Sequence, residues 1–135
     1  VLGHYVADAA QPHHTTIHFN GWAESAPNPR GFSMDRDFHA RFESAFVEAH
    51  IVYRDVGDRM APEPRELGDV REAVLDHVRE SNATVERLYE LEQAVGFDPE
   101  EGHSETRTFV IERLTSGAEM LRACLATWNR TSHTS

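Results

Sequence analysis

Residues 36–52, with the sequence RDFHARFESAFVEAHIV, decide the fold class of this chain. Their apolar side chains recur every three or four residues, as one face of an amphipathic helix requires. The positions on this face are Phe38, Phe42, Ala45, Phe46 and Ala49. Arg41, Ser44 and Glu48 fall on the opposite side. The pattern therefore predicts a helix with one face in a core and the other in water.

Three further segments show helical periodicity. A helix over residues 1–10 should end before Pro12, because proline disfavours helical geometry in the residue that precedes it. Asp69 and Glu72 form a capping pattern, which predicts one long helix that ends near Gly96. A fourth helix is expected after a polar connector at 98–105. Its expected apolar face is Val110, Leu114, Ala118, Leu121, Leu125 and Trp128.

No segment alternates apolar and polar residues as a strand would, so we expect an all-α helical bundle that forms a single domain over residues 1–135. Residues 13–35, between the first two helices, are rich in Asn, Pro, Gly and Ser. Such a long loop in a small domain is usually functional or disordered, so we expect one long functional loop.

The composition excludes several classes of protein. The chain carries 13 basic and 23 acidic residues, a net charge of −10, which disfavours a stable nucleic-acid partner. No apolar run approaches the roughly 18 residues of a transmembrane segment. Cys124 is the single cysteine, so neither a disulfide framework nor a cysteine-rich zinc module is possible.

Two histidine–carboxylate pairs are the chemically informative feature. His4 and Asp8 are four residues apart on one expected helix, and His39 and Glu43 are four apart on the next. That spacing places both side chains of a pair on one helix face. Imidazole and carboxylate groups are ligands for a catalytic zinc ion, and His14 lies between the pairs in the sequence. A zinc site between helices is one interpretation, and ordinary ion pairs on helix surfaces are the other.

The segment HYVADAAQPHH at 4–14 resembles the His-x-x-x-Asp-x-x-Gln-Pro-x-His signature of the zinc-dependent phospholipase C and S1/P1 nuclease superfamily. The segment HARFE at 39–43 is similar to the second signature of that superfamily, and the two occur in the expected order. The resemblance covers about the first fifty residues. It implies a zinc-dependent phosphoric ester hydrolase with an all-α fold.

The resemblance also implies a role for each matched residue. His14, His39 and Glu43 would hold one zinc ion, and His4 and Asp8 would help to hold a second. Asp8 would bridge to a third ion and is therefore the expected catalytic residue. The complete site of the superfamily would use up to three zinc ions. Its remaining ligands lie upstream of the first signature, and only three residues precede His4 here, so the chain resembles the C-terminal half of such an enzyme. The missing N-terminal half, with its further ligands, is then an expected partner. By the same resemblance the protein would be bacterial and secreted or periplasmic.

The substrate is the least determined feature. Glu43, where the nucleases tend to have Asp, favours a phospholipase C-like activity on lipid head-group phosphodiesters over a single-strand nuclease. A metal-binding helical fragment without hydrolytic activity is the remaining alternative. His18, Phe19 and Trp22 are expected to line a substrate cleft, unless they only pack the loop.

Four further histidines have no assigned part in this site. His50 lies two helical turns after Glu43 and could approach the site, although a core or surface position is the simpler expectation. We expect His77, His103 and His133 at the surface.

Overall fold

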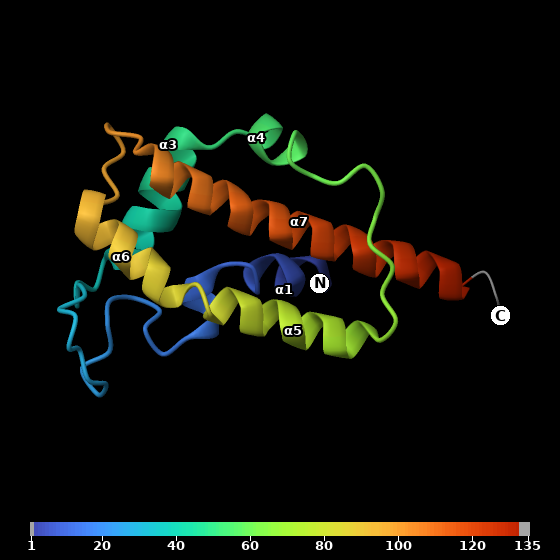
Figure 1. The fold of residues 1–135 in the computed structure, drawn as a ribbon, viewed down its shortest axis with the longest axis horizontal. Helices are drawn as coiled ribbons and strands as arrows, with labels where there is room; N and C mark the ends of the chain where they lie inside the picture. The colour runs from blue at the N-terminus through green and yellow to red at the C-terminus, as the bar shows by residue number, and fades with distance from the viewer. Residues whose placement is uncertain (1, 133–135) are drawn as a thin grey trace.

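The computed structural model describes residues 2–132, and this range contains helices and loops but no strand, which confirms the all-α prediction. Figure 1 shows α1 between the longest helix, α7, and α5. The elements in chain order are α1 Leu2–Asp8, η1 Pro12–Thr15, α2 Phe38–Ala40, η2 Arg41–Val47, α3 Glu48–His50, α4 Tyr53–Gly57, α5 Val70–Asn82, α6 Val85–Val95 and α7 Ser104–Ser132.

The predicted helix over 36–52 is present as one continuous rod formed by α2, η2 and α3, and its middle part, η2, is a wider π-helix. Phe38, Phe42 and Phe46 are all buried and follow one another at intervals of four. In an α-helix with about 3.6 residues per turn, each such step drifts around the axis by roughly 40°. Residues four apart still share one helix face, so the three rings are buried together. His39 and Glu43, which are also four apart, share a face in the same way.

The expected long helix over 69–96 is wrong, because the structure has two helices, α5 and α6, joined at Ala83 and Thr84. Asp69 caps the start of α5 as predicted, since its side chain accepts from the Glu72 backbone N–H. At the break, the hydroxyl and the backbone N–H of Thr84 both donate to the Ser81 carbonyl, at 2.7 and 3.0 Å. Such local hydrogen bonds compete with the helical ladder. Figure 1 shows that the chain bends there.

The loop over 13–35 is built into the core. Trp22 and Phe32 are buried in an aromatic cluster with the phenylalanine rings of the 38–50 helix. Tyr89 of α6 is fully buried in the same cluster, and its hydroxyl donates to the His18 carbonyl at 2.8 Å. Burial raises the pKa of the Tyr89 phenol. The aromatic cluster thus fixes the loop against α6.

Helix α7 buries a different face from the one predicted. Val110 is buried as expected, but Leu114, Leu125 and Trp128 are 40, 52 and 68 % exposed. The reason is the close approach of α1: a Cβ atom at Gly117 would lie 2.8 Å from the Cβ of Ala10. The small side of α7 therefore faces α1. None of the helices in the described range combines the length and apolarity that a membrane crossing needs.

Candidate metal centre

A sharp turn after α1 carries His14 toward the 38–50 helix. Pro12 begins the 3-10 helix η1, and the Gln11 side chain caps it by accepting from the His13 backbone N–H at 3.3 Å. The residues between α1 and His14 are therefore held in a fixed turn. As a result His14 lies close to His39 and Glu43, which come from another element.

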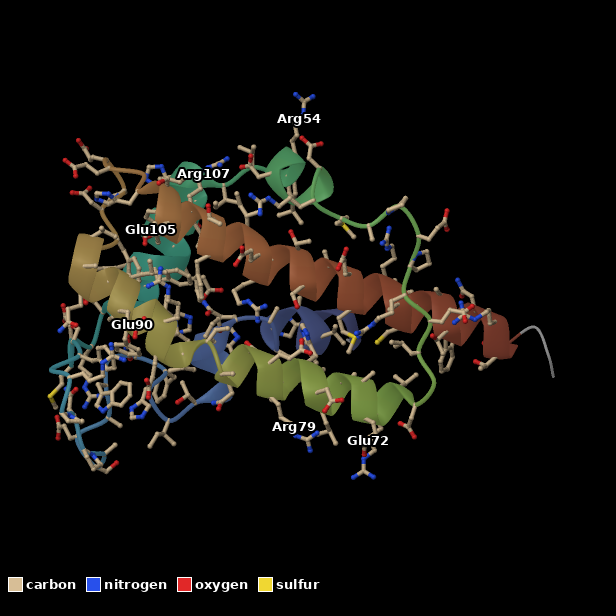
Figure 2. All side chains as sticks on the ribbon, in the orientation of Figure 1. Arg54, Glu72, Arg79, Glu90, Glu105 and Arg107 are labelled. Carbon is tan, nitrogen blue, oxygen red and sulfur yellow. The ribbon has the colours of Figure 1, made fainter. Side chains whose placement is uncertain are left out.

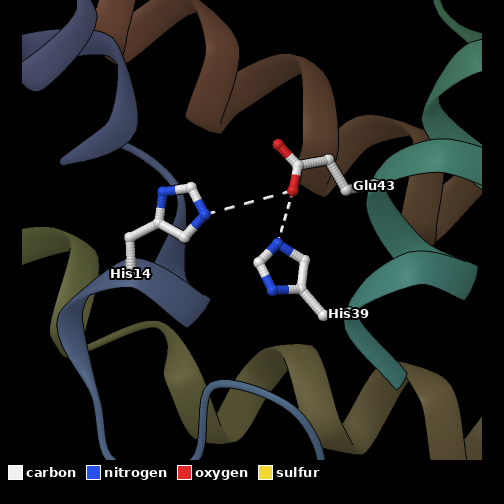
Figure 3. A group of neighbouring side chains, drawn as sticks. All are labelled: His14, His39 and Glu43. Atoms are coloured by element: carbon white, nitrogen blue, oxygen red, sulfur yellow. Dashed lines mark hydrogen bonds and ion pairs between the residues drawn. The ribbon is translucent and has the colours of Figure 1, made fainter. Parts of the chain in front are cut away.

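His14, His39 and Glu43 form the core of the site (Figure 3). Each offers one ligating atom, and the three atoms lie within 4.8 Å of one another. His14 Nε2 is 4.0 Å from Glu43 Oε2, and His39 Nε2 donates a hydrogen bond to the same oxygen. The sequence-predicted trio is thus brought together from two elements that are distant in the chain.

His4 and Asp8 extend this cluster along α1. His4 Nε2 is 3.1 Å from one Asp8 oxygen, and His14 Nδ1 is 3.8 Å from the other. The two ring nitrogens of His14 therefore face two different carboxylates, those of Asp8 and Glu43. All five sequence-predicted ligands belong to one connected group. A second or third metal ion on His4 and Asp8 remains a prediction.

Asn20 positions the start of the helix that carries His39, and sequence reasoning missed it. Its Oδ1 accepts from the His39 backbone N–H at 3.1 Å, and its Nδ2 donates to the Arg36 carbonyl. Gly21 makes this contact possible, because its φ is +82° and a Cβ there would lie 2.5 Å from the Asp35 carbonyl oxygen. The Asn-Gly pair in the sequence was the available signal for this turn.

The site is open to solvent on one side. The side chains of His39, His14 and Glu43 are 24, 29 and 49 % exposed. Beside them lies a pocket of about 210 Å³, lined by Asp8, His14 and Glu43. Gln11 and Arg113 also line it, and the rest of the wall is apolar, with Phe42, Val47, Val110 and Leu114. A small polar ligand can therefore reach the cluster from outside.

His13 forms the buried wall behind the site. Its ring is fully buried among aromatic side chains and lies 4.8 Å, centre to centre, from the ring of His39. Burial, with smaller contributions from His39 and His14, lowers the pKa of His13 to about 3. Within the described part of the chain, neither ring nitrogen has a hydrogen-bond partner. His13 is therefore a neutral packing residue against His39.

His18, Phe19 and Trp22 were expected to line a substrate cleft, but Trp22 is buried in the core. Trp22 is 8 % exposed, its Nε1 donates to the Pro27 carbonyl, and the His18 ring stacks on it at 3.7 Å. We therefore correct its role to a core residue that anchors the loop. Partial burial lowers the pKa of His18, and its Nδ1 accepts from the Ala23 backbone N–H. Of the three, Phe19 alone is largely exposed.

The remaining histidines lie outside the cluster. His50 contacts Phe46 and the Asp98 carbonyl. His77 is buried, so its expected surface position is wrong, whereas His103 is partly exposed beside Glu101. His133 lies outside the described residues.

Comparison of the chain with protein-family models, with curated proteins and with solved structures finds no match.

Proposed function

We propose that this chain carries the zinc site of a phosphodiester hydrolase with phospholipase C-like activity. The observation that supports the proposal is the convergence of His14, His39 and Glu43, three residues from two elements, at one partly open point. Asp8 and His4 lie next to this point.

The donor set fits zinc. Two imidazole nitrogens and one carboxylate oxygen are the three protein ligands typical of a catalytic zinc site, which leaves a further position open. Ligands at about 2.0–2.1 Å from a tetrahedral ion are about 3.3 Å apart. The widest separation within the trio, up to 4.8 Å, must therefore shorten by roughly 1.5 Å, whereas the hydrogen-bonded His39 Nε2 and Glu43 Oε2 must move apart. The exposed Glu43 carboxylate has room for that movement.

Asp8 has a distinct role in this proposal. Its carboxylate lies beside His14 Nδ1, so it orients the imidazole with Nε2 toward Glu43. A carboxylate behind a ligating histidine also strengthens the ligand, as in many zinc sites. Zinc in such a site lowers the pKa of water toward neutrality and supplies positive charge opposite a phosphoryl oxygen. Asp8 is also a carboxylate beside the trio that can accept a proton from an attacking water.

The proposed substrate is a lipid head-group phosphodiester in preference to single-stranded nucleic acid. Trp22, which was expected in the substrate cleft, is in the core and therefore does not offer its face to a base. The pocket beside the cluster has apolar walls from Phe42, Val47 and Leu114, which suits an apolar substituent on the phosphate. The net charge of −10 disfavours a polyanion.

Zinc titration of the purified chain tests the site. We expect one tight zinc ion per chain, lost in His39→Ala because the remaining pair is too small a ligand set. His103→Ala, which removes a histidine far from the cluster in sequence, is the matched control and should bind zinc normally. Equal affinity in His39→Ala and the unmodified chain would refute the assignment.

Substrate choice is tested separately with the zinc-loaded full-length protein, because the 135-residue chain alone should hydrolyse neither substrate above background. Phosphatidylcholine and single-stranded DNA are offered in parallel, and we expect release of the lipid head group to exceed cleavage of DNA. The reverse order would favour the nuclease. Tight zinc binding without hydrolysis of either substrate would identify a metal-binding fragment.

A further inference from the structure

We propose that the corner between α3 and α4 docks the protein on the surface of an electrically neutral lipid bilayer. The inference rests on the proposed function, which places the substrate in lipid. It concerns a surface, however, that none of the predicted zinc ligands belongs to.

The surface consists of a groove and an exposed edge. The groove, about 690 Å³, lies between α3, α4 and α7. Its lining is apolar except for Glu48, and it includes Val47, Ile51, Val56, Met60 and Leu114. Val52 and Tyr53 form the edge at the start of α4, where they are 63 and 99 % exposed. A lipid surface buries apolar groups of this kind, and a tyrosine suits its boundary because one end of the ring is apolar and the other polar.

The groove adjoins the candidate metal centre. Val47 and Leu114 line the groove and also the smaller pocket that contains Asp8, His14 and Glu43. A lipid whose chain lies along the groove would therefore have its head group near the metal ligands. This continuity is what selects lipid as the occupant.

Polar contacts hold the edge in its exposed position. Asp55 accepts from the Val52 backbone N–H at 3.0 Å and pairs with Arg107 of α7 at 2.6 Å. These two contacts hold the pKa of Asp55 below its usual value. Figure 2 shows Arg107 on α7 and Arg54 at the outer side of α4. Tyr53 is therefore exposed on a helix, α4, that Asp55 fixes to α7.

Charge selects the kind of surface. With a net charge of −10, the chain is repelled by an anionic membrane and by a second copy of itself. A zwitterionic surface carries no such penalty. Docking by an exposed apolar edge is a peripheral contact.

The test is sedimentation of the 135-residue chain with phosphatidylcholine vesicles in a chelator, so that neither zinc binding nor turnover contributes. We expect the chain to bind, and Val52→Ser/Tyr53→Ser to weaken binding by about tenfold, because both apolar groups are lost from the interface. The matched control is Leu125→Ser/Trp128→Ser, which removes another exposed apolar pair, from the C-terminal part of α7. It should bind as the unmodified chain does, and circular dichroism should show all three proteins folded.

Four results would overturn the proposal: no binding to phosphatidylcholine, equal losses in both double variants, binding that requires an anionic lipid, or a Tyr53-dependent dimer in light scattering without vesicle binding. Because the assay contains no zinc, its failure leaves the zinc titration intact. Conversely, a failed zinc titration would refute the zinc site without changing the result expected for vesicle binding.

Discussion

At the scale of single residues, burial decides which histidines are accessible to a metal ion or a proton from solvent. His14 and His39 are partly exposed beside carboxylates, whereas His13 and His77 are buried. A buried imidazole is costly to protonate, so it serves packing and makes stability depend on pH.

His77 should make the fold sensitive to acid. Burial lowers its pKa below 6.5; Arg113 and Arg65 act in the same direction, and Glu80 and a Val6 backbone hydrogen bond oppose it. The unfolded chain therefore binds the proton first, and the free energy of unfolding should fall as pH drops below about 6.5. Denaturant unfolding at pH 7 and pH 5 measures this loss.

His77→Gln cannot titrate and should show a smaller loss between the two pH values, with His13 accounting for part of what remains. His103→Gln, at a partly exposed position, should behave as the unmodified chain. An unchanged pH dependence in His77→Gln would contradict the assignment.

Trp22 should contribute to stability more than to metal binding. Trp22→Ala removes a buried ring from the aromatic cluster and should cost about 3–5 kcal/mol of unfolding free energy. Phe19→Ala, at an exposed position in the same loop, should change it by no more than about 0.5 kcal/mol. Chemical denaturation compares the two, and a similar cost for both would contradict the core position of Trp22.

At the scale of elements, the contact between α1 and α7 decides where His4 and Asp8 lie. Ala10 approaches α7 at Gly117, where a Cβ would come within 2.8 Å of the Ala10 Cβ. A methyl group at Gly117 would therefore require Ala10, in the turn that follows α1, to move.

Gly117→Ala should therefore lower the melting temperature. Alanine stabilises an exposed helix by about 1 kcal/mol relative to glycine, but overpacking costs about 1–3 kcal/mol. Ala10→Gly in the same chain removes the opposing methyl group and should restore stability. A double-mutant cycle measures the coupling, and additive effects would show that the two positions do not touch.

At the scale of the whole molecule, the number of converging metal-ligating side chains limits the hydrolytic activity that we expect of this chain. Among the described residues, one group of three or more metal-ligating side chains converges, the group of His14, His39 and Glu43. His4 and Asp8 add a pair of groups, short of the roughly three protein ligands of a catalytic zinc site.

The 135-residue chain should therefore bind one zinc ion tightly and turn over slowly. Metal analysis after dialysis should give about one zinc per chain, and His4→Ala should retain it because His4 is not in the converging trio. Phosphodiester hydrolysis by this chain alone should stay near background. Rapid, chelator-sensitive turnover would show that a second metal site is complete within these residues.

Local patterns in the sequence were sufficient for the helical class and for most residues of the candidate cluster. Helical spacing predicted α1, the 38–50 helix and α7, and the i, i+4 pairs indicated His4, Asp8, His39 and Glu43, whereas the family resemblance indicated His14. These features depend on neighbours within a few residues, which a sequence displays directly.

The tertiary structure alone decided how those pieces meet. The break between α5 and α6 is a local exception: the hydrogen bonds from Thr84 to Ser81 compete with the helical ladder, although the apolar periodicity continues past them. The face of α7 that contains Gly117 packs against residues 7–10, because the two segments can approach closely only where α7 has no side chain. Leu125 and Trp128 lie on another face and are exposed. Trp22 enters the core because Tyr89, 67 residues later, completes its pocket. Such contacts depend on distances between remote segments, and periodicity along the chain carries no record of them.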